Sequence, residues 1–208
     1  MLYQYVKHDC EVVCFTVDEV CVTDHRMADL PVIPFEKVAS RYDPSEHSMI
    51  IAVGFVEMND LRERKYREAS ALGYSFINYI HSSVVLHDDL AFGENNIILD
   101  HVSLHPGTHV GNSIFIASGS VVGHRCSIGD NCWINSGVSV AGGCNIGPGC
   151  FLGINSSIGQ GVRLGAKTFV GANTLIARDT GNGEVYISES GQRFRLKSDA
   201  FLRFARLP

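Results

Sequence analysis

The stretch VVGHRCSIGDNCWINSGVSVAGGCNIG, residues 121–147, repeats one pattern every six residues. An aliphatic residue opens each repeat, and the same phase continues in both directions without a break. The complete series is Val110, Ile116, Val122, Ile128, Ile134, Val140, Ile146, Leu152, Ile158, Leu164, Val170 and Ile176. Such a fixed period is typical of a repeat architecture rather than of an ordinary globular domain.

Two positions beside each aliphatic residue are restricted as well. The residue that follows is nearly always small, as at Gly111, Gly123, Gly129, Gly147, Gly153 and Gly165. We interpret this position as a turn where a side chain is unwelcome. The residue two places before the aliphatic one is slim, as at Ser120, Cys126, Cys132, Val138, Cys144, Cys150, Ser156 and Thr168. It is therefore predicted to point inward as well.

A unit of six residues is too short for a helix pair or a hairpin, but it suits one short flat strand and a corner. Three units close a triangular coil of eighteen residues, and successive coils stack at the parallel-strand spacing of about 4.8 Å. The sequence therefore predicts a mainly β chain built on a parallel β-helix prism. A weaker form of the phase, reaching back to Ile80, extends this prism over residues 80–179.

The cysteines fit the same repeat. Cys126 and Cys144 are eighteen residues apart, as are Cys132 and Cys150, so each pair is predicted to stack inside the prism. Free cysteine behaves as a small buried hydrophobe, and no CxxC spacing supports zinc. We therefore expect reduced packing thiols and no metal site.

Composition narrows the functional classes. The 208 residues are 45% hydrophobic and 19% charged, with a formal net charge of -5. Scattered Lys and Arg argue against a nucleic-acid or membrane surface. No apolar run approaches the roughly 18 residues needed to cross a bilayer, and no signal peptide is evident at the start. We expect a soluble, cytoplasmic protein without a membrane span.

The flanking segments predict two smaller units. Residues 1–79 contain the strand EVVCFTVD, ending in Asp18, the strand MIIAVG, ending in Gly54, and a helix, NDLRERKYREASALG. This alternation predicts a small α/β domain. Residues 180–208 predict a hairpin that turns at Ser190 and Gly191, then a short amphipathic helix from Ser198. We expect that unit to cap the open end of the prism.

The repeat resembles that of the hexapeptide-repeat acyltransferases, whose prism is a left-handed β-helix. Residues 121–159 are most similar to the branch that acetylates nucleotide-linked sugars, including the bacillosamine-pathway, perosamine and sialic-acid acetyltransferases. The resemblance extends upstream to the small Rossmann-like domain of that branch. Here this domain is truncated, since the glycine-rich first loop is replaced by MLYQYVKHDC.

The resemblance assigns a catalytic role to one residue. The family's general base falls on His124 of HRCSIG, and imidazole titrates near neutrality, as acyl transfer requires. The acid that follows this base in the family is Arg125 here, and an asparagine seven residues earlier is Ala117.

The family's acyl donor is acetyl-coenzyme A, which it binds in grooves between the subunits of a homotrimer. Contacts to the coenzyme carry over to Gly142, Ile154 and Ala172. The spacing supports the first of these independently. Gly142 lies eighteen residues after His124, so it is predicted one coil further along the same corner, where a small residue leaves room for a thioester.

The acceptor implied by the resemblance is an amino-sugar nucleotide. The family places a carboxylate near the nucleotide at Asp18, and the predicted loop at Gly54 leads into a helix N-terminus that can hold an anion. Trp133 replaces a second histidine of the branch, and is expected either to stack on a sugar or to cover a subunit interface. We predict an N-acetyltransferase; the alternatives are a sugar O-acetyltransferase and an inactive scaffold of the same fold.

Overall fold

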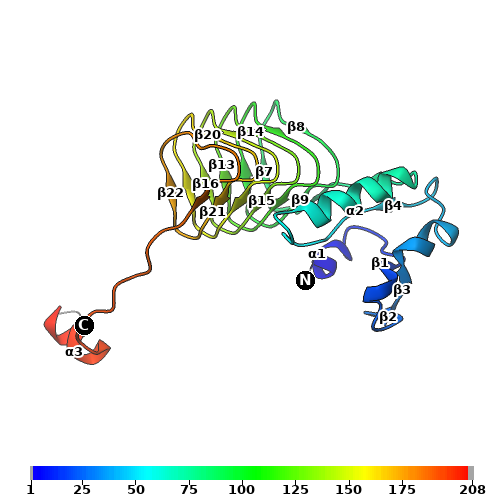
Figure 1. The fold of residues 1–208 in the computed structure, drawn as a ribbon, viewed down its shortest axis with the longest axis horizontal. Coiled ribbons are helices and arrows are strands. Elements are labelled where there is room, and N and C mark those ends of the chain that lie inside the picture. The colour runs from blue at the N-terminus through cyan, green and yellow to red at the C-terminus, as the bar shows by residue number, and fades with distance from the viewer. Residues whose placement is uncertain (1, 206–208) are drawn as a thin grey trace.

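The computed structural model describes residues 2–205 and shows a long prism with a small domain packed at one end (Figure 1). The small domain contains α1 (Leu2–Val6), β1 (Phe15–Val17), β2 (Arg26–Met27), β3 (Leu30–Pro34), β4 (Ser48–Met49), α2 (Asp60–Ala71) and β5 (Ser75–Phe76), with 3-10 turns at Glu19–Cys21 and Phe35–Ser40. After the prism the chain ends in α3 (Ser198–Phe204). No helix among the described residues is both long and apolar enough to span a membrane.

Three parallel sheets form the prism, as predicted. The six-stranded sheet holds β7 (Val85–Leu86), β10 (Ser103–Leu104), β13 (Val121–Val122), β16 (Ser139–Val140), β19 (Ser157–Ile158) and β22 (Leu175–Ile176). The five-stranded sheet holds β8 (Ala91–Phe92), β11 (His109–Val110), β14 (Ser127–Ile128), β17 (Asn145–Ile146) and β20 (Arg163–Leu164). The seven-stranded sheet holds β6 (Tyr79–Ile80), β9 (Ile97–Ile98), β12 (Phe115–Ile116), β15 (Trp133–Ile134), β18 (Phe151–Leu152), β21 (Phe169–Val170) and β23 (Val185–Tyr186).

The register confirms the eighteen-residue coil. Val122 pairs with Val140, for example, and Ile128 with Ile146. The aliphatic series points into the prism and is at most 3% exposed throughout, so burial of these side chains drives the coils together.

The slim residue two places before each aliphatic one also makes a hydrogen bond, which the sequence analysis did not predict. Its hydroxyl or thiol donates a hydrogen bond to the carbonyl oxygen fifteen residues later, in the neighbouring coil. The pairs are Thr108 to Gly123, Ser120 to Asn135, Cys126 to Ala141, Cys132 to Gly147, Cys144 to Gly159 and Cys150 to Gly165. Small donors at this position therefore link successive coils inside an otherwise apolar core.

The small residue after each aliphatic one was interpreted as a turn requirement, and that reason is wrong. A Cβ on Gly123 would lie 2.6 Å from Gly142 N, and one on Gly153 would lie 2.6 Å from Ala172 N. These glycines are needed because the next coil passes so close to them. The left-handed turn instead falls two residues later, at Asp89, Asn95, His101, Gly107, Ser113, Gly119, Arg125, Asn131, Gly137, Gly143, Gly149, Asn155, Gly161, Lys167 and Asn173.

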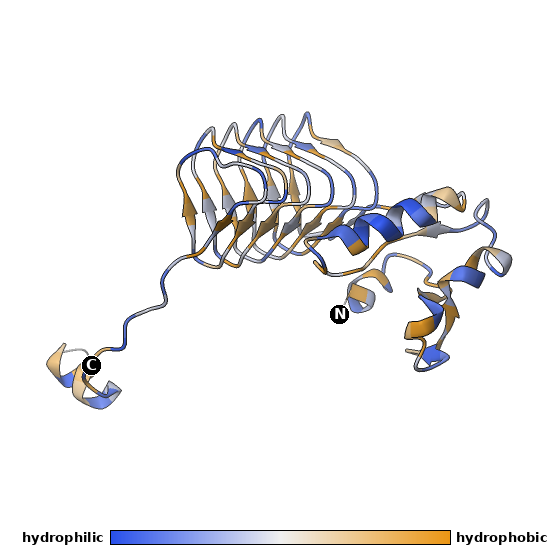
Figure 2. Ribbon diagram, in the orientation of Figure 1, coloured by the Kyte–Doolittle hydropathy of each residue, from blue (hydrophilic) through white to orange (hydrophobic). Residues whose placement is uncertain are grey.

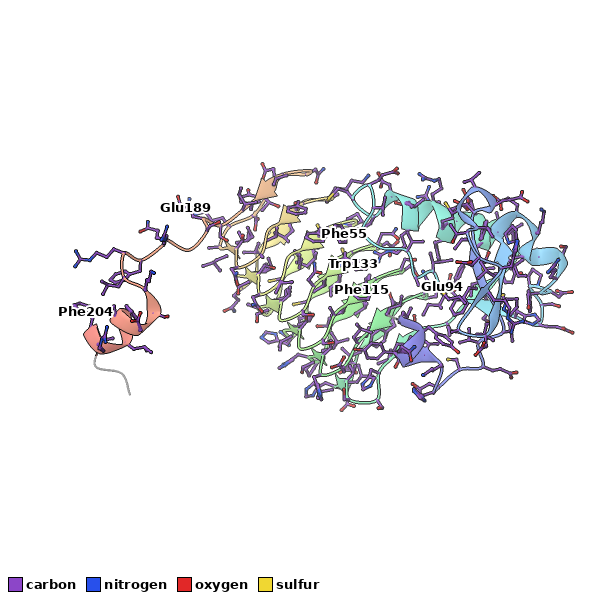
Figure 3. The ribbon with its side chains drawn as sticks, turned by 90° about the horizontal axis from the view of Figure 1, so that it is seen from below. Phe55, Glu94, Phe115, Trp133, Glu189 and Phe204 are labelled. Atoms are coloured by element: carbon purple, nitrogen blue, oxygen red, sulfur yellow. The ribbon has the colours of Figure 1, made fainter. Side chains whose placement is uncertain are left out.

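The small domain covers the outer face of the seven-stranded sheet. That face is a ladder of large side chains: Tyr79, Ile97, Phe115, Trp133, Phe151 and Phe169. The rings of Phe115 and Trp133 stack with centroids 4.0 Å apart, and Phe55 of the small domain packs on Trp133 at 5.6 Å (Figure 3). The two units therefore share an aromatic interface.

Polar contacts from α2 hold the same interface, although this helix is mostly hydrophilic (Figure 2). The Arg62 guanidinium is buried, donates to the carbonyl oxygens of Asn131 and Cys132 at 2.8 and 3.1 Å, and lies 5.2 Å from the centre of the Trp133 ring. Burial lowers the pKa of Arg62 to about 10, so it stays charged at neutral pH. At the start of α2, Lys167 forms an ion pair with Asp60 at 2.6 Å.

Within the small domain the sheet is split. Strands β1, β3 and β2 form one sheet, and β4 pairs with β5 in another. Of the predicted strand MIIAVG, residues 49–54, only Met49 takes part in a ladder, as the second residue of β4. These strands and α2 form the small α/β region that the sequence predicts.

The C-terminal hairpin was wrongly predicted. Val185–Tyr186 instead pairs in parallel with Phe169–Val170, because it continues the spiral by one more strand. An isolated hairpin would gain little stability by comparison. The helix forms where expected, at Ser198–Phe204, but it does not cap the prism: an extended segment carries it away from the open end (Figure 1).

The burial of the cysteines predicts graded reactivity. Burial raises the pKa of the Cys126 and Cys144 thiols, and that of Cys132 well above its usual value, which lowers the thiolate fraction. In titration of the native protein with a thiol-specific disulfide reagent, we expect exposed Cys21 to react first and half-buried Cys10 and Cys14 more slowly. The four prism thiols should react only after unfolding; their rapid reaction in the native state would contradict the packing role.

Arg62 offers a test of the domain interface. Arg62→Ala removes the guanidinium from two buried carbonyl oxygens and from the Trp133 ring, so we expect a loss of about 2–4 kcal/mol in unfolding free energy. The single tryptophan, Trp133, reports this interface directly in denaturant titrations followed by fluorescence. The exposed neighbour Arg64→Ala serves as control and should change stability little. Equal effects of the two substitutions would contradict the structural role of Arg62.

Candidate active site

The predicted base lies on an exposed corner of the prism. His124 follows β13 and precedes β14, so it stands at the corner between the six-stranded and five-stranded sheets. Its carbonyl oxygen accepts a hydrogen bond of 2.8 Å from Gly143 N of the next coil. This bond fixes the backbone of the corner and leaves the imidazole accessible to solvent.

Gly142 lies against the imidazole, as its spacing predicted. A Cβ on Gly142 would lie 2.5 Å from Nε2 of His124, 2.7 Å from Cε1 and 2.9 Å from Cδ2. Any side chain at residue 142 would therefore displace the ring. The Gly142 N–H donates no hydrogen bond within residues 2–205, so it is free to meet an acceptor beside the imidazole.

No carboxylate orients the ring within the described part of the chain, where the His124 side chain makes no hydrogen bond. Arg125, which replaces the family's acid, occupies the left-handed corner position with φ of 53°. Its side chain runs toward the preceding coil, because a Cβ on Gly107 would lie 3.3 Å from Arg125 Cγ. Within one chain, packing against Gly142 is what positions the imidazole.

The other two predicted coenzyme contacts lie on a different corner. Ile154 follows β18 and Ala172 follows β21, so both stand between the seven-stranded and six-stranded sheets. They are neighbours, since Asn173 N donates to the Ile154 carbonyl oxygen at 2.8 Å, and both are exposed. One chain therefore brings Gly142 to His124, but it does not bring Ile154 or Ala172 there.

Trp133 packs against other residues of its own chain. It belongs to β15 on the seven-stranded sheet, which is the side of the prism opposite the His124 corner. Phe115, Phe55 and Arg62 surround the ring, and its Nε1 donates to Asn135 Oδ1 at 3.2 Å. The half-buried ring is therefore part of the interface between the small domain and the prism, and its expected contact with a sugar or a partner subunit stays a prediction.

Asp18 lies at the end of β1 beside two cavities of about 590 and 580 Å3. Its Oδ1 is 2.5 Å from Nζ of Lys65, which also lies 2.6 Å from Oε2 of Glu68. Burial opposes the charge of Lys65, but the hydrogen bonds and charges of Asp18 and Glu68 prevail and raise its pKa. Lys65 also lies 4.8 Å from the centre of the Phe35 ring.

This group contains residues that the sequence analysis missed. Lys65 and Phe35 line both cavities together with Asp18, and offer a cation and an aromatic ring to a ligand. Nothing in the sequence distinguishes Lys65 from the other charged residues of α2. Gly54 does not line either cavity, and nothing lies within 4 Å of where its Cβ would be. The Asn59–Asp60 start of α2 faces the prism, where Asn59 Nδ2 donates to the Gly149 carbonyl oxygen at 3.2 Å.

Sequence comparison supports the repeat directly. The model of the family described as bacterial transferase hexapeptide (six repeats) matches residues 125–153 and 143–178. A search of curated protein sequences gives no significant match.

Solved structures share the fold over nearly the whole chain. Perosamine N-acetyltransferase from Caulobacter crescentus, in complex with coenzyme A and GDP-perosamine, is 27% identical, with a TM-score of 0.79 over 88% of this chain and 86% of that one. A variant of the same enzyme with the same ligands is 26% identical, with a TM-score of 0.82 over 90% and 87%. The acetyltransferase domain of PglB from Neisseria gonorrhoeae, with acetyl-coenzyme A, shares the fold at 21% identity, with a TM-score of 0.73 over 79% of each chain.

The alignments with perosamine N-acetyltransferase cover both the small α/β domain and the prism. The chain has the left-handed β-helix fold of the hexapeptide-repeat acyltransferases, and it is similar to nucleotide-sugar acetyltransferases over nearly its whole length.

Proposed function

We propose that this protein is an acetyl-coenzyme A-dependent N-acetyltransferase that acts on an amino-sugar nucleotide. The observation that carries the proposal is the His124 imidazole lying against Gly142 on an exposed corner, in a fold shared with an enzyme that holds coenzyme A and GDP-perosamine. Both substrates are metabolites of the cytoplasm, which is where we place the reaction.

The site contains the groups that acetyl transfer requires. His124 takes a proton from the sugar amine as its nitrogen attacks the thioester carbonyl carbon. The carbonyl oxygen becomes an oxyanion, for which the free Gly142 N–H is a donor. Collapse of the tetrahedral intermediate breaks the carbon–sulfur bond, and the imidazolium returns its proton to the departing coenzyme A thiolate. No metal is needed for these steps.

The acceptor binds in the small domain, beside Asp18. The cavities at Asp18 offer Lys65 to a phosphate and Phe35 to a ring. This domain covers the seven-stranded sheet, whereas His124 stands at the opposite corner of the triangle. A sugar held in this domain is therefore presented to the His124 of another copy.

The separation of the corners also supports a homotrimer. Gly142 and His124 lie on one corner and Ile154 and Ala172 on another, so a single extended coenzyme contacts both sets when two prisms stand side by side. Threefold symmetry repeats this groove three times in a closed assembly.

Light scattering of the purified protein should give three times the mass of the chain, because each groove needs two neighbouring chains. A monomer that is active at the same concentration would contradict the shared groove.

Removal of the proposed base gives the direct test of activity. In an assay for free coenzyme A thiol, with acetyl-coenzyme A and a panel of amino-sugar nucleotides, His124→Ala should lower kcat by about 10²–10⁴-fold. His109→Ala, an exposed histidine of β11 on the same prism, is the matched control and should retain full activity. Full activity of His124→Ala would remove this residue from catalysis. Turnover of hydroxyl-bearing but not amine-bearing sugars would favour O-acetylation.

Gly142→Ala tests the position of the imidazole without removing it. The new methyl group would meet three ring atoms within 2.9 Å, so the ring must move, and we expect kcat to fall about 100-fold in a folded protein. Gly191→Ala is the control, since nothing lies within 4 Å of the methyl group it adds. Wild-type kcat in Gly142→Ala would show that the contact with His124 has no catalytic consequence.

A further inference from the structure

The end of the chain differs in charge from the rest of the protein. Residues 192–208, which we call the basic tail, contain five of the 17 Lys and Arg residues and only one of the 22 Asp and Glu residues. The tail therefore has a net charge of +4, while residues 1–191 have a net charge of -9. The whole-chain value of -5 conceals this division, and the argument from scattered Lys and Arg against a membrane surface does not apply to the tail, where these residues are clustered.

Large apolar side chains accompany these charges and are exposed. Phe194 is 52% exposed, Leu202 is 44% exposed and Phe204 is 67% exposed. Figure 1 shows the cause: α3 stands clear of the prism at the end of the extended segment that follows β23. Nothing in the described part of the chain covers these side chains, although exposing several phenylalanines together is unfavourable in water.

Apolar and basic residues alternate in the segment before α3. In residues 193–197 Arg193, Arg195 and Lys197 alternate with Phe194 and Leu196, and the backbone bends at Arg195 and Leu196.

The helix α3 places apolar and charged side chains on different faces. At 100° per residue, Phe201, Phe204 and Ala205 share one face of α3, and Asp199 and Arg203 share another. The Phe194 and Phe201 rings pack edge to face at 5.3 Å, so the apolar side continues from the extended segment into the helix.

The tail does not pack against the body of its own chain. The last strands and the residue after them expose Leu175, Val185 and Ile187 near the point from which the tail departs, yet the tail does not fold back onto them. A second copy of the chain is the competing partner, and the measurement of assembly mass described below distinguishes it.

We propose that the basic tail binds the surface of an anionic lipid membrane. Phenylalanine and leucine side chains enter the interface between headgroups and acyl chains, and the basic side chains meet lipid phosphates. Each Lys or Arg near such a surface contributes by attraction to its negative potential. The eleven residues between Tyr186 and Ser198 span up to about 40 Å when extended, so the prism remains in water beside the membrane.

This inference does not rest on the proposed acetyl transfer, because it concerns a segment outside the prism. Its test is sedimentation of the full-length protein with vesicles of phosphatidylcholine and phosphatidylglycerol at 3:1, compared with phosphatidylcholine alone. We expect binding to the anionic vesicles only, and weaker binding in 500 mM than in 50 mM NaCl, since salt screens the attraction.

Charge and apolar surface are tested separately. The triple variant Arg193→Glu, Arg195→Glu, Lys197→Glu should lose about 100-fold or more in vesicle affinity. Phe201→Asp with Phe204→Asp should lose binding while keeping the basic charges. The control triple variant Arg41→Glu, Arg64→Glu, Arg67→Glu makes the same change of net charge on the small domain and should bind like wild type.

The outcomes against the proposal are equally specific. Absence of sedimentation with anionic vesicles would overturn it, as would equal loss in the control variant. A change of assembly mass on deletion of residues 192–208, without vesicle binding by the full-length protein, would assign the tail to a second copy of the chain instead. Acetyl transfer measured without vesicles reports the proposed function independently and should be the same in all tail variants.

Discussion

The close stacking of eighteen-residue coils is the constraint on which the other features of this protein depend. Aliphatic side chains fill the prism, and slim thiols and hydroxyls link neighbouring coils through hydrogen bonds to the carbonyl fifteen residues later. The coils approach so closely that Gly123 has no room for a Cβ against Gly142. The same approach brings the His124 ring against Gly142, so the geometry of the candidate site follows from the packing of the core.

The period of the sequence was enough to predict the prism, its inward cysteines and the neighbour of His124, because every eighteenth residue returns to the same position. It did not reveal which corner residue adopts the left-handed conformation. Asn, Gly, Arg, Lys and Ser all occur there, and only the backbone identifies it. Arg125, conspicuous as a departure from the family, is one member of this series of corners.

Features that depend on contacts between distant segments were not predictable in the same way. Trp133 is an outward residue of the repeat, and nothing in its own coil indicates that Phe55 and Arg62 cover it. Lys65 meets Asp18 only because α2 passes the end of β1. The hairpin prediction was wrong for a related reason. Val185–Tyr186 pairs with the edge strand β21, which is distant in sequence, and not with the segment that directly follows it.

The arrangement of corners leads to the central claim, which is that the active site is completed between two copies of the chain. Co-assembly of two inactive variants tests it most directly: His124→Ala removes the base, and Ile154→Trp fills the coenzyme side of the groove from an exposed corner. If the site is shared, random mixed assemblies combine intact His124 from one chain with intact Ile154 from the other, and roughly a quarter of wild-type activity should return. No recovery on mixing, or full activity of Ile154→Trp by itself, would contradict the account.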